Sequence, residues 1–319
     1  MTTTVTTIDC HYLDRTEFAA AYLLVADDDV ALIDNNTNHA VPHLLRALDD
    51  HGLQPEQVRY LIITHVHLDH AGATSTLAEL CPAASVIAHP RAAPHVVDPT
   101  RLVASASAVY GEDEFARLYG EIGPISSERV VKMEDESTLD FGSSGLLFLH
   151  TRGHANHHCC IVEPDSGSVF TGDAFGLHYP QLQDNGPFAV PSTSPTDFDA
   201  ELARAAVRRI RDLQPERVYP THFGAATAID TTATQLLTEL DAAEQFMEQA
   251  VTSAAADEEL TDFLRPRLQA HFDERLGLHF SAAALAAARE LLALDIELNA
   301  QGIAFAAAKQ RRKRAQTSV

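Results

Sequence analysis

Three histidines and an aspartate crowd into one short stretch of the chain. Residues 64–70 read Thr-His-Val-His-Leu-Asp-His, so His65, His67, Asp69 and His70 fall within six positions. In an extended loop the side chains of His65 and His67 project to the same side, and Asp69 and His70 can curl back toward a nearby point. Imidazole nitrogens suit zinc and iron, and a carboxylate also admits harder cations. The residue types and their spacing therefore predict a site for two metal ions.

The elements around this cluster would position it. The apolar run at 60–64 (Tyr-Leu-Ile-Ile-Thr) indicates a short strand, and residues 73–80 indicate the helix that follows. A loop between two packed elements holds its side chains in place. A surface accident is therefore the weaker explanation of the cluster.

Three more candidate ligands follow later strands. They are His154 after Leu-Leu-Phe-Leu-His-Thr-Arg-Gly, Asp173 after Val-Phe-Thr-Gly, and His222 after Val-Tyr-Pro-Thr. Each of them alone could be an ordinary turn residue. Because all three follow predicted strands after the first cluster, together they are better candidates for metal ligands than each is alone.

Taken together, these motifs resemble those of the metallo-β-lactamase superfamily, whose first ligand motif is HxHxDH after a strand. The resemblance spans about residues 20–224. It implies a four-layer αββα sandwich of the α/β (α+β) class. By motif position, one metal would bind His65, His67 and His154, the other would bind Asp69, His70 and His222, and Asp173 would bridge both.

The resemblance also implies a chemistry. Two divalent ions, with zinc as the first choice and iron or manganese as alternatives, would make a bridging hydroxide available at neutral pH. The expected reaction is hydrolysis of a small ester, thioester or lactone, and Asp69 would also orient the attacking group. His178 and Tyr179, which follow the bridging aspartate, would contact the substrate, although packing is an equal explanation for the tyrosine.

Details of the motifs indicate which branch of the family the chain resembles most. Secreted zinc β-lactamases usually carry a signal peptide and lack the bridging aspartate. The pattern is more similar to glyoxalase II and to lactonases. Glyoxalase II usually has Thr-Pro-Gly-His-Thr-x-Gly-His, and this chain departs from that pattern at Arg152, Ala155 and His157. These departures leave the ligand intact but put specificity for glutathione thioesters in doubt.

Other polar residues near the motifs have two interpretations. Asp34 follows an apolar strand and could orient a ligand imidazole or begin a turn. His157 and His158 open another predicted strand, where hydrogen-bonded structural imidazoles are a better explanation than a third metal site.

The composition of the chain indicates which classes of partner and which cellular location to expect. The 23 basic and 45 acidic residues give a formal net charge of −22, which repels phosphate backbones and anionic membranes. The N-terminus lacks the basic and apolar regions of a secretory signal. No run approaches the roughly 18 uninterrupted apolar residues of a membrane helix. The four cysteines form no Cys-x-x-Cys motif. We expect a cytoplasmic protein that binds a small molecule and neither nucleic acid nor membrane.

The rest of the chain suggests two domains. Residues 1–230 form the predicted catalytic domain, with a hairpin near 20–33 and four strands between residues 130 and 170. Residues 231–319 form a helical C-terminal extension, with helices over 231–251, 257–276 and 281–309, which would act as a lid or pair two chains in a homodimer. The basic run at 309–314 indicates a solvated helix end.

Two rival functions remain open. A mononuclear iron sulfur (persulfide) dioxygenase of the same fold would use only His65, His154 and Asp173. A non-catalytic member would keep the metal site as a remnant, although such members tend to lose ligands.

Overall fold

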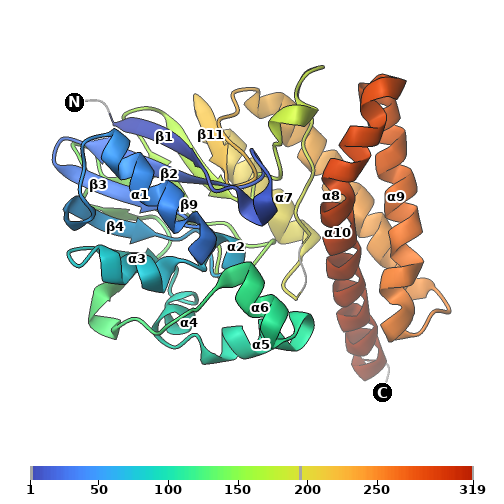
Figure 1. Cartoon of the computed structure of the whole chain (residues 1–319). Helices are drawn as coiled ribbons and strands as arrows, with labels where there is room; N and C mark the ends of the chain where they lie inside the picture. Colours follow the sequence, from blue (N-terminus) through green and yellow to red (C-terminus); the bar gives the residue numbers. More distant parts are fainter. Residues whose placement is uncertain (1–2, 194–195, 318–319) are drawn as a thin grey trace. The chain divides into compact units, whose positions relative to one another are not determined.

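A computed structural model describes residues 3–193 and 196–317, with Val109 and Tyr110 described by their backbone alone. The chain divides into two compact units. The first comprises Met1–Thr151, His157–Asp173 and Leu213–Ile229, and the second comprises Arg152–Asn156, Ala174–Asp212 and Asp230–Val319. Figure 1 follows the chain through both units.

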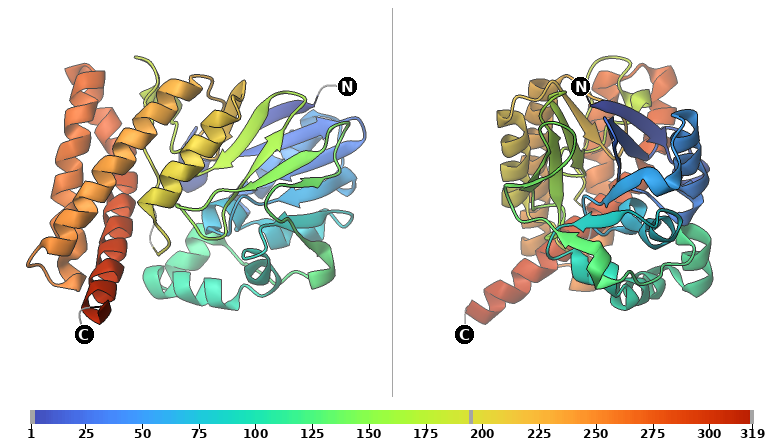
Figure 2. Two further views of the ribbon diagram at one scale, coloured as in Figure 1. Left: turned by 180° about the vertical axis from the view of Figure 1, so that it is seen from behind. Right: turned by 90° about the vertical axis from the view of Figure 1, so that its left-hand side faces the viewer.

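Two β-sheets form the centre of the first unit, and Figure 2 shows them facing each other. The larger sheet has the strand order β1-β2-β3-β4-β5-β6, and the smaller has the order β11-β10-β9-β8-β7. The strands of the larger sheet are β1 (Thr4–Asp9), β2 (Ala20–Ala26), β3 (Asp29–Ile33), β4 (Val58–Ile62), β5 (Ser85–Ala88) and β6 (Val130–Lys132). The strands of the smaller sheet are β7 (Ser137–Leu139), β8 (Leu146–His150), β9 (Cys159–Glu163), β10 (Ser168–Gly172) and β11 (Arg217–Pro220).

Strand β2 shows why the larger sheet is buried on both faces. Successive side chains of a strand point to opposite faces. Tyr22 and Leu24 enter the core between the two sheets, where they meet Phe148 and Phe170 of the smaller sheet. Leu23 faces the other way, into the core beneath the helices. Burial of each such side chain contributes about 1.5–3 kcal/mol, so the continuous apolar sequence of β2 follows from its two-sided packing.

Among the residues that the structure describes, six helices lie in the first unit. They are α1 (Val41–Asp50), α2 (Leu68–Ala71), α3 (Thr74–Leu80), α4 (Ala93–Val97), α5 (Thr100–Tyr110) and α6 (Glu112–Tyr119). Leu44 and Leu48 of α1 and Leu77 of α3 pack in the same core as Leu23. The turns of 3₁₀ helix in the chain are η1 (Tyr12–Asp14), η2 (Asn38–Ala40), η3 (Pro55–Gln57), η4 (Ser127–Arg129), η5 (Pro180–Leu182) and η6 (Asp257–Glu259).

Long helices dominate the second unit. They are α7 (Ala200–Asp212), α8 (Ile229–Thr252), α9 (Leu260–His279) and α10 (Ala282–Thr317), and α9 and α10 pack against each other. Two buried polar residues of α10 bind the loop that precedes α7. Asp295 accepts a hydrogen bond from Tyr179 (3.2 Å), and the Asn299 side chain accepts one from the Thr193 amide (2.8 Å).

The structure confirms the predicted fold class: two sheets plus helices, followed by a C-terminal helical extension. The three predicted C-terminal helices are present, and the last continues through the basic run. In that run, Arg311 donates to the carbonyls of Ala250 and Val251, so it caps the end of α8 as well as lying at a helix end.

The strand count between residues 130 and 170 differs from the prediction. Five strands begin there, and β6 joins the larger sheet by pairing in parallel with β5. A three-residue strand carries too little sequence pattern to reveal its partner. The division into domains 1–230 and 231–319 stays a prediction, because a compact unit is not thereby an independent domain.

Among the described residues, one helix is long and apolar enough to cross a membrane, namely α10. Half of its most apolar stretch is buried within the protein, a property that core helices share.

Candidate metal centre

The strand ends of the first unit bring the predicted ligands to one place. Strands β3 and β4 run parallel, as do β10 and β11. The carboxyl ends of parallel strands meet at one edge of a sheet. Asp34 and Asp173 directly follow β3 and β10, His222 is the second residue after β11, and His65 is the third residue after β4.

The first motif folds as its spacing predicts. The ring centroid of His65 lies 4.4 Å from that of His67 and 4.0 Å from that of His70. The short helix α2 begins after His67 and turns the chain, which carries His70 back to His65. His65 and His70 are fully buried, whereas His67 is half-buried.

Asp69, His70 and His222 form one group of potential ligands. Their ligand atoms all lie within 4.8 Å of one another. One carboxylate oxygen of Asp69 lies 3.4 Å from Nε2 of His222 and 3.8 Å from Nε2 of His70. This is the set that the motifs predict for one of the two metals.

Asp173 lies between this group and His65. Its Oδ1 atom is 3.2 Å from Nε2 of His70 and 3.8 Å from Nε2 of His222. With His65 and His70, it makes a second group whose ligand atoms lie within 4.8 Å of one another. A carboxylate at this position can bridge two cations.

Three imidazoles of the site are each held by a hydrogen bond at Nδ1. Nδ1 of His70 lies 2.8 Å from Asp34, and Nδ1 of His222 lies 2.9 Å from the carbonyl of Phe18. Carboxylates and carbonyls only accept hydrogen bonds, so both Nδ1 atoms carry the proton. The Thr64 hydroxyl donates to Asp34 and therefore accepts from Nδ1 of His65 at 3.1 Å. In all three rings, the hydrogen bond at Nδ1 leaves Nε2 as the atom that could bind a metal.

Asp34 holds several residues of the site by hydrogen bonds. It is buried, and besides His70 it accepts hydrogen bonds from the Thr64 amide (2.8 Å) and from the hydroxyl of Thr221 (2.7 Å). Of its two interpretations, the structure therefore supports the one in which it orients a ligand. Thr221 precedes His222, so one carboxylate fixes residues from three strand ends.

His158 has a structural role, as expected. It is fully buried, its Nδ1 donates to the Thr151 hydroxyl at 2.8 Å, and its Nε2 accepts from the Asp173 amide at 3.2 Å. Both ring nitrogens are thereby used, and the imidazole positions the backbone of Asp173. His157 is half-buried, and its ring stacks on His65 with centroids 6.1 Å apart.

Charges within the site shift its pKa values strongly. Burial raises the pKa of Asp69, but neighbouring His70 and His222 outweigh it and hold the pKa well below its usual range. Burial lowers the pKa of His70, yet Asp173, Asp69 and Asp34 raise it well above its usual value. Burial likewise lowers the pKa of His222, and Asp173 and Asp69 raise it to about 9. The carboxylates thus favour positive charge at this point.

These residues fit divalent metal ions. The Nε2 atom of His70 is buried, faces the Asp173 and Asp69 carboxylates and has no hydrogen-bond partner among the described residues. Such an atom is costly to bury unless a cation binds it. The donor set of imidazole nitrogens and carboxylate oxygens is the one that zinc, iron and manganese prefer.

His154 belongs to the short segment Arg152–Asn156, which clusters with the second unit. Its Nδ1 lies 3.1 Å from the carbonyl of Ser192 in the same unit, so its Nε2 also keeps a lone pair. Thr151 and His157, which flank the segment, belong to the first unit. Its ligand role stays a prediction from the motif.

His178 and Tyr179 lie in the second unit. His178 is buried, and burial lowers its pKa to about 4. Tyr179 is fully buried, and its hydroxyl donates to Asp295 of α10. A packing role therefore accounts for Tyr179, and substrate contact by either residue stays a prediction.

The sequence interpretation missed three supporting residues. Thr221 is 187 residues from its partner Asp34, and Phe18 is 204 residues from its partner His222. Only the fold reveals these two contacts. Gly172 could have been found from the sequence, because a glycine directly before a candidate ligand often marks a close approach of the backbone to other residues. Its φ is +48°, and a Cβ there would lie 2.6 Å from Nε2 of His158 and 2.8 Å from the Thr64 hydroxyl.

Two proteins illustrate what this chain is similar to in sequence. The protein ST1585 of Sulfurisphaera tokodaii, described as a metallo-β-lactamase fold-containing protein, is 25% identical over 214 residues, which are 65% of this chain and 74% of that protein. A coenzyme F420H(2) oxidase from Methanothermobacter marburgensis is 28% identical over 162 residues, half of this chain and 34% of the oxidase.

Solved structures share the fold. The crystal structure of ST1585 matches with a TM-score of 0.64 at 20% identity and covers 94% of this chain and 97% of that one. The metallo-β-lactamase family protein TTHA1429 from Thermus thermophilus matches with a TM-score of 0.65 at 18% identity, over 98% of this chain and 94% of that one. The model of the metallo-β-lactamase superfamily matches residues 15–222, which hold every predicted ligand. The chain belongs to the metallo-β-lactamase superfamily.

Proposed function

We propose that the protein is a dinuclear metal-dependent hydrolase that acts on a small ester, thioester or lactone. The observation that carries this proposal is the place of Asp173. Its carboxylate lies beside His70 and His222 and also groups with His65, so one residue can serve two cations. Paired metal ions of this kind are typical of hydrolytic sites.

The proposed ligand sets follow the motifs. His65, His67 and His154 would hold one ion, and Asp69, His70 and His222 would hold the other, with Asp173 shared. Two such cations, when bound, lower the pKa of a shared water and polarise a carbonyl oxygen.

The protein's own residues supply orientation and access. Asp34, Thr64 and the Phe18 carbonyl fix the rings of His70, His65 and His222. The Asp69 side chain is 26% exposed, whereas that of His70 is completely buried. Of these two residues, Asp69 is therefore the one that solvent reaches, and its low pKa keeps it able to accept a hydrogen bond from an attacking water.

The choice of bond rests on the branch that the motifs resemble. The bridging aspartate is shared with glyoxalase II and the lactonases, and the departures at Arg152, Ala155 and His157 disfavour glutathione thioesters. A lactone, a simple ester or another thioester is the substrate class that we propose.

A panel of substrates tests the proposal. Protein reconstituted with zinc, manganese or iron is assayed on a lactone, a 4-nitrophenyl ester and an acyl thioester. We expect turnover of at least one of them, loss of turnover in His70→Ala, and wild-type rates in the control His51→Ala, since His51 is exposed at the end of α1. Absence of turnover with every metal would overturn the proposal.

A second candidate is an iron-dependent redox function. The similarity to part of a coenzyme F420H(2) oxidase favours it. A single iron on His65, His154 and Asp173 would suit the sulfur dioxygenase, but the group of Asp69, His70 and His222 would then have no role. Oxygen consumption by the iron-loaded protein with a persulfide, without hydrolysis of any panel substrate, would favour this candidate.

A further inference from the structure

The turn between β3 and η2 has a strained backbone at Asn36. Its φ is +56°, a left-handed conformation that residues other than glycine adopt at some cost. The residue is 1% exposed, and its Oδ1 atom is buried and has no hydrogen-bond partner among the described residues. A strained backbone and an unsatisfied buried acceptor both lower stability, and such features concentrate at functional sites. The contacts that Asn36 does make are therefore worth following.

The contacts of Asn36 lie at the break between α2 and α3. In a continuous helix the Ala73 amide would donate to the carbonyl of Asp69, four residues earlier. Instead, the Ala73 amide donates to the backbone carbonyl of Asn36 (3.0 Å), and the side-chain amide of Asn36 donates to the Asp69 carbonyl (2.9 Å). Asn36 thus takes the place of both partners in one helical hydrogen bond, and α2 ends at Ala71.

The neighbouring residue, Asn35, strengthens the same break. Its backbone amide donates to the carbonyl of His70 (2.8 Å), and its side-chain oxygen also accepts from the Ala73 amide (3.0 Å). Gly72 lies so close to this turn that an added Cβ would be 3.0 Å from the carbonyl oxygen of Asn36. The backbone carbonyls of two predicted metal ligands are thus bound by the residues that follow β3.

Asp69 depends on this arrangement more than His70 does. The ring of His70 is completely buried and is also held by Asp34, whereas the side chain of Asp69 is 26% exposed. The Asp69 carboxylate lies against Nε2 of His222 (3.4 Å) and Nε2 of His70 (3.8 Å), which are themselves the atoms that would bind a metal. The hydrogen bond from Asn36 to the Asp69 carbonyl, in contrast, does not compete with metal binding and would continue to orient Asp69.

We propose that Asn36 is a positioning residue of the metal centre, which holds the peptide of Asp69 so that the carboxylate binds the same ion as His70 and His222. This inference rests on the proposed function, which assigns Asp69 to one of two metals. It also accounts for the residue type. Glycine would adopt the left-handed conformation more easily, but it would lack the side-chain amide that binds the Asp69 carbonyl.

A cobalt titration followed by visible absorption tests the role of Asn36. Asn36→Gly removes the side-chain amide, keeps the backbone carbonyl for the Ala73 amide and tolerates the positive φ. The step that depends on Asp69 is identified as the one that Asp69→Ala weakens. We expect Asn36→Gly to lower the affinity of that step about tenfold, as for loss of a contact that orients a metal ligand.

The control for this test is Asn185→Gly. Asn185 is exposed in the second unit, and its side-chain amide donates to the carbonyl of His279 (3.0 Å). The control therefore removes the same kind of hydrogen bond by the same substitution, and it should bind cobalt as the wild-type protein does. Wild-type affinity in Asn36→Gly, an equal loss in Asn185→Gly, or a titration in which Asp69→Ala weakens no step would overturn the inference.

A double-mutant cycle distinguishes the positioning of Asp69 from a general structural role. Residues that act through one group give non-additive losses. Because Asn36 acts through the Asp69 carboxylate, Asn36→Gly should cause little further loss of cobalt affinity in the Asp69→Ala background. Additive losses would show that Asn36 supports the protein without orienting Asp69.

These measurements also separate the inference from the proposed function, because cobalt binding requires no turnover. A non-additive loss of cobalt affinity supports the role of Asn36 even where no ester, thioester or lactone is hydrolysed. Unchanged cobalt binding in Asn36→Gly contradicts that role even where hydrolysis is found.

Discussion

Asp34 is the residue on which the orientation of the candidate site depends. It accepts hydrogen bonds from His70, Thr64 and Thr221, which come from three different parts of the first unit. We expect Asp34→Ala to lower metal affinity by roughly 10–100-fold, because carboxylates that hold ligand imidazoles contribute about that much. Competition with a chromogenic chelator measures the affinity.

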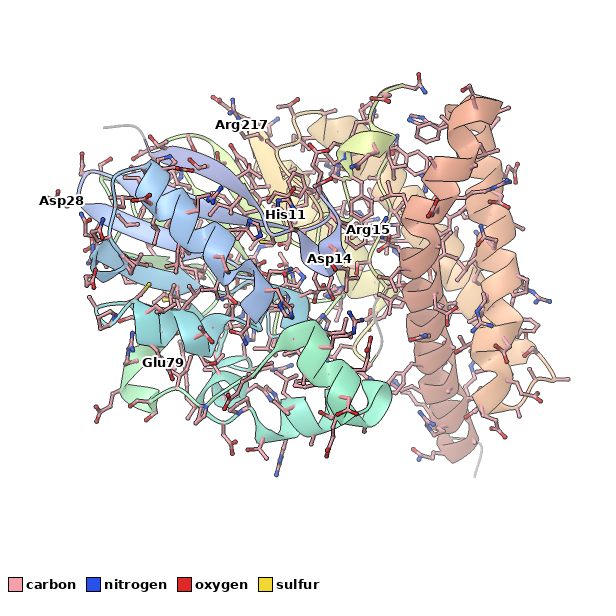
Figure 3. The ribbon with its side chains drawn as sticks, in the orientation of Figure 1. His11, Asp14, Arg15, Asp28, Glu79 and Arg217 are labelled. Atoms are coloured by element: carbon pink, nitrogen blue, oxygen red, sulfur yellow. The ribbon has the colours of Figure 1, made fainter. Side chains whose placement is uncertain are left out.

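The control for this prediction is Asp28→Ala. Asp28 is exposed in the turn between β2 and β3, so its loss changes the net charge equally without touching the site (Figure 3). Wild-type affinity in Asp34→Ala would show that His70 needs no carboxylate to position it.

His178 predicts a pH dependence of stability. It is 4% exposed, and burial lowers its pKa from 6.5 to about 4. Between these values the unfolded chain binds a proton that the folded protein resists, so the free energy of unfolding falls as the pH drops below about 6.5. Above that pH the group is neutral in both states and contributes nothing to the dependence.

We expect His178→Phe to remove this part of the acid destabilisation, on the order of 2–3 kcal/mol at pH 4. Urea unfolding of both proteins at several pH values between 4 and 7.5 gives the difference. Any change in packing from the substitution alters the free energy of unfolding equally at every pH. Only the difference in its slope against pH therefore reports on His178. Parallel curves would mean that His178 is protonated in the folded state.

At the scale of elements, the turn at the end of β10 is the most constrained part of the site. Gly172 has a φ of +48°, and a Cβ there would meet His158 and Thr64 at less than 3 Å. We expect Gly172→Ala to lower the free energy of unfolding by about 1–3 kcal/mol and to weaken metal binding, because the collision displaces Asp173 and His65 together. Urea unfolding and chelator competition measure the two effects.

Gly52 provides the matched control. Its φ is +68°, but an added Cβ would find no described heavy atom within 4 Å. Gly52→Ala therefore carries the backbone penalty alone and should leave metal affinity unchanged. Equal behaviour of the two variants would contradict the close packing at Gly172.

The elements also show what sequence can predict. The hairpin of β2 and β3 and the three C-terminal helices follow from local patterns of apolar residues, so their positions were predicted closely. The sheet to which β6 belongs depends on a parallel partner more than forty residues away, about which its three residues say nothing. In the same way, the HxHxDH spacing alone predicts candidate ligands, whereas the threonine contacts to Asp34 depend on which strand ends meet.

At the scale of the whole molecule, the site joins the two sheets of the first unit. His65 and His70 follow β4 of the larger sheet, and Asp173 and His222 follow strands of the smaller one. Metal binding should therefore stabilise the folded state, by about 2.7 kcal/mol at a metal concentration of 100 Kd. We expect removal of metal by a chelator to lower the melting temperature by roughly 5–10 °C.

Differential scanning fluorimetry with and without the chelator checks this expectation. In His222→Ala the shift should be smaller, since one ligand set is incomplete. An unchanged melting temperature in the wild-type protein would show that metal does not hold the two sheets together.

The predicted partners of the molecule are still untested. A homodimer through the C-terminal helices and the absence of nucleic-acid and membrane partners remain predictions. Leu278 of α9 is 85% exposed and is a suitable place for a substitution that would disrupt such a dimer.

The measurement that tests the account most directly is the metal content of each chain, determined by plasma mass spectrometry on protein purified without chelators or a metal-binding tag. We predict close to two equivalents of zinc, manganese or iron in the wild-type protein, and close to one in His222→Ala. A single equivalent in the wild-type protein, or none after reconstitution, would contradict the dinuclear site.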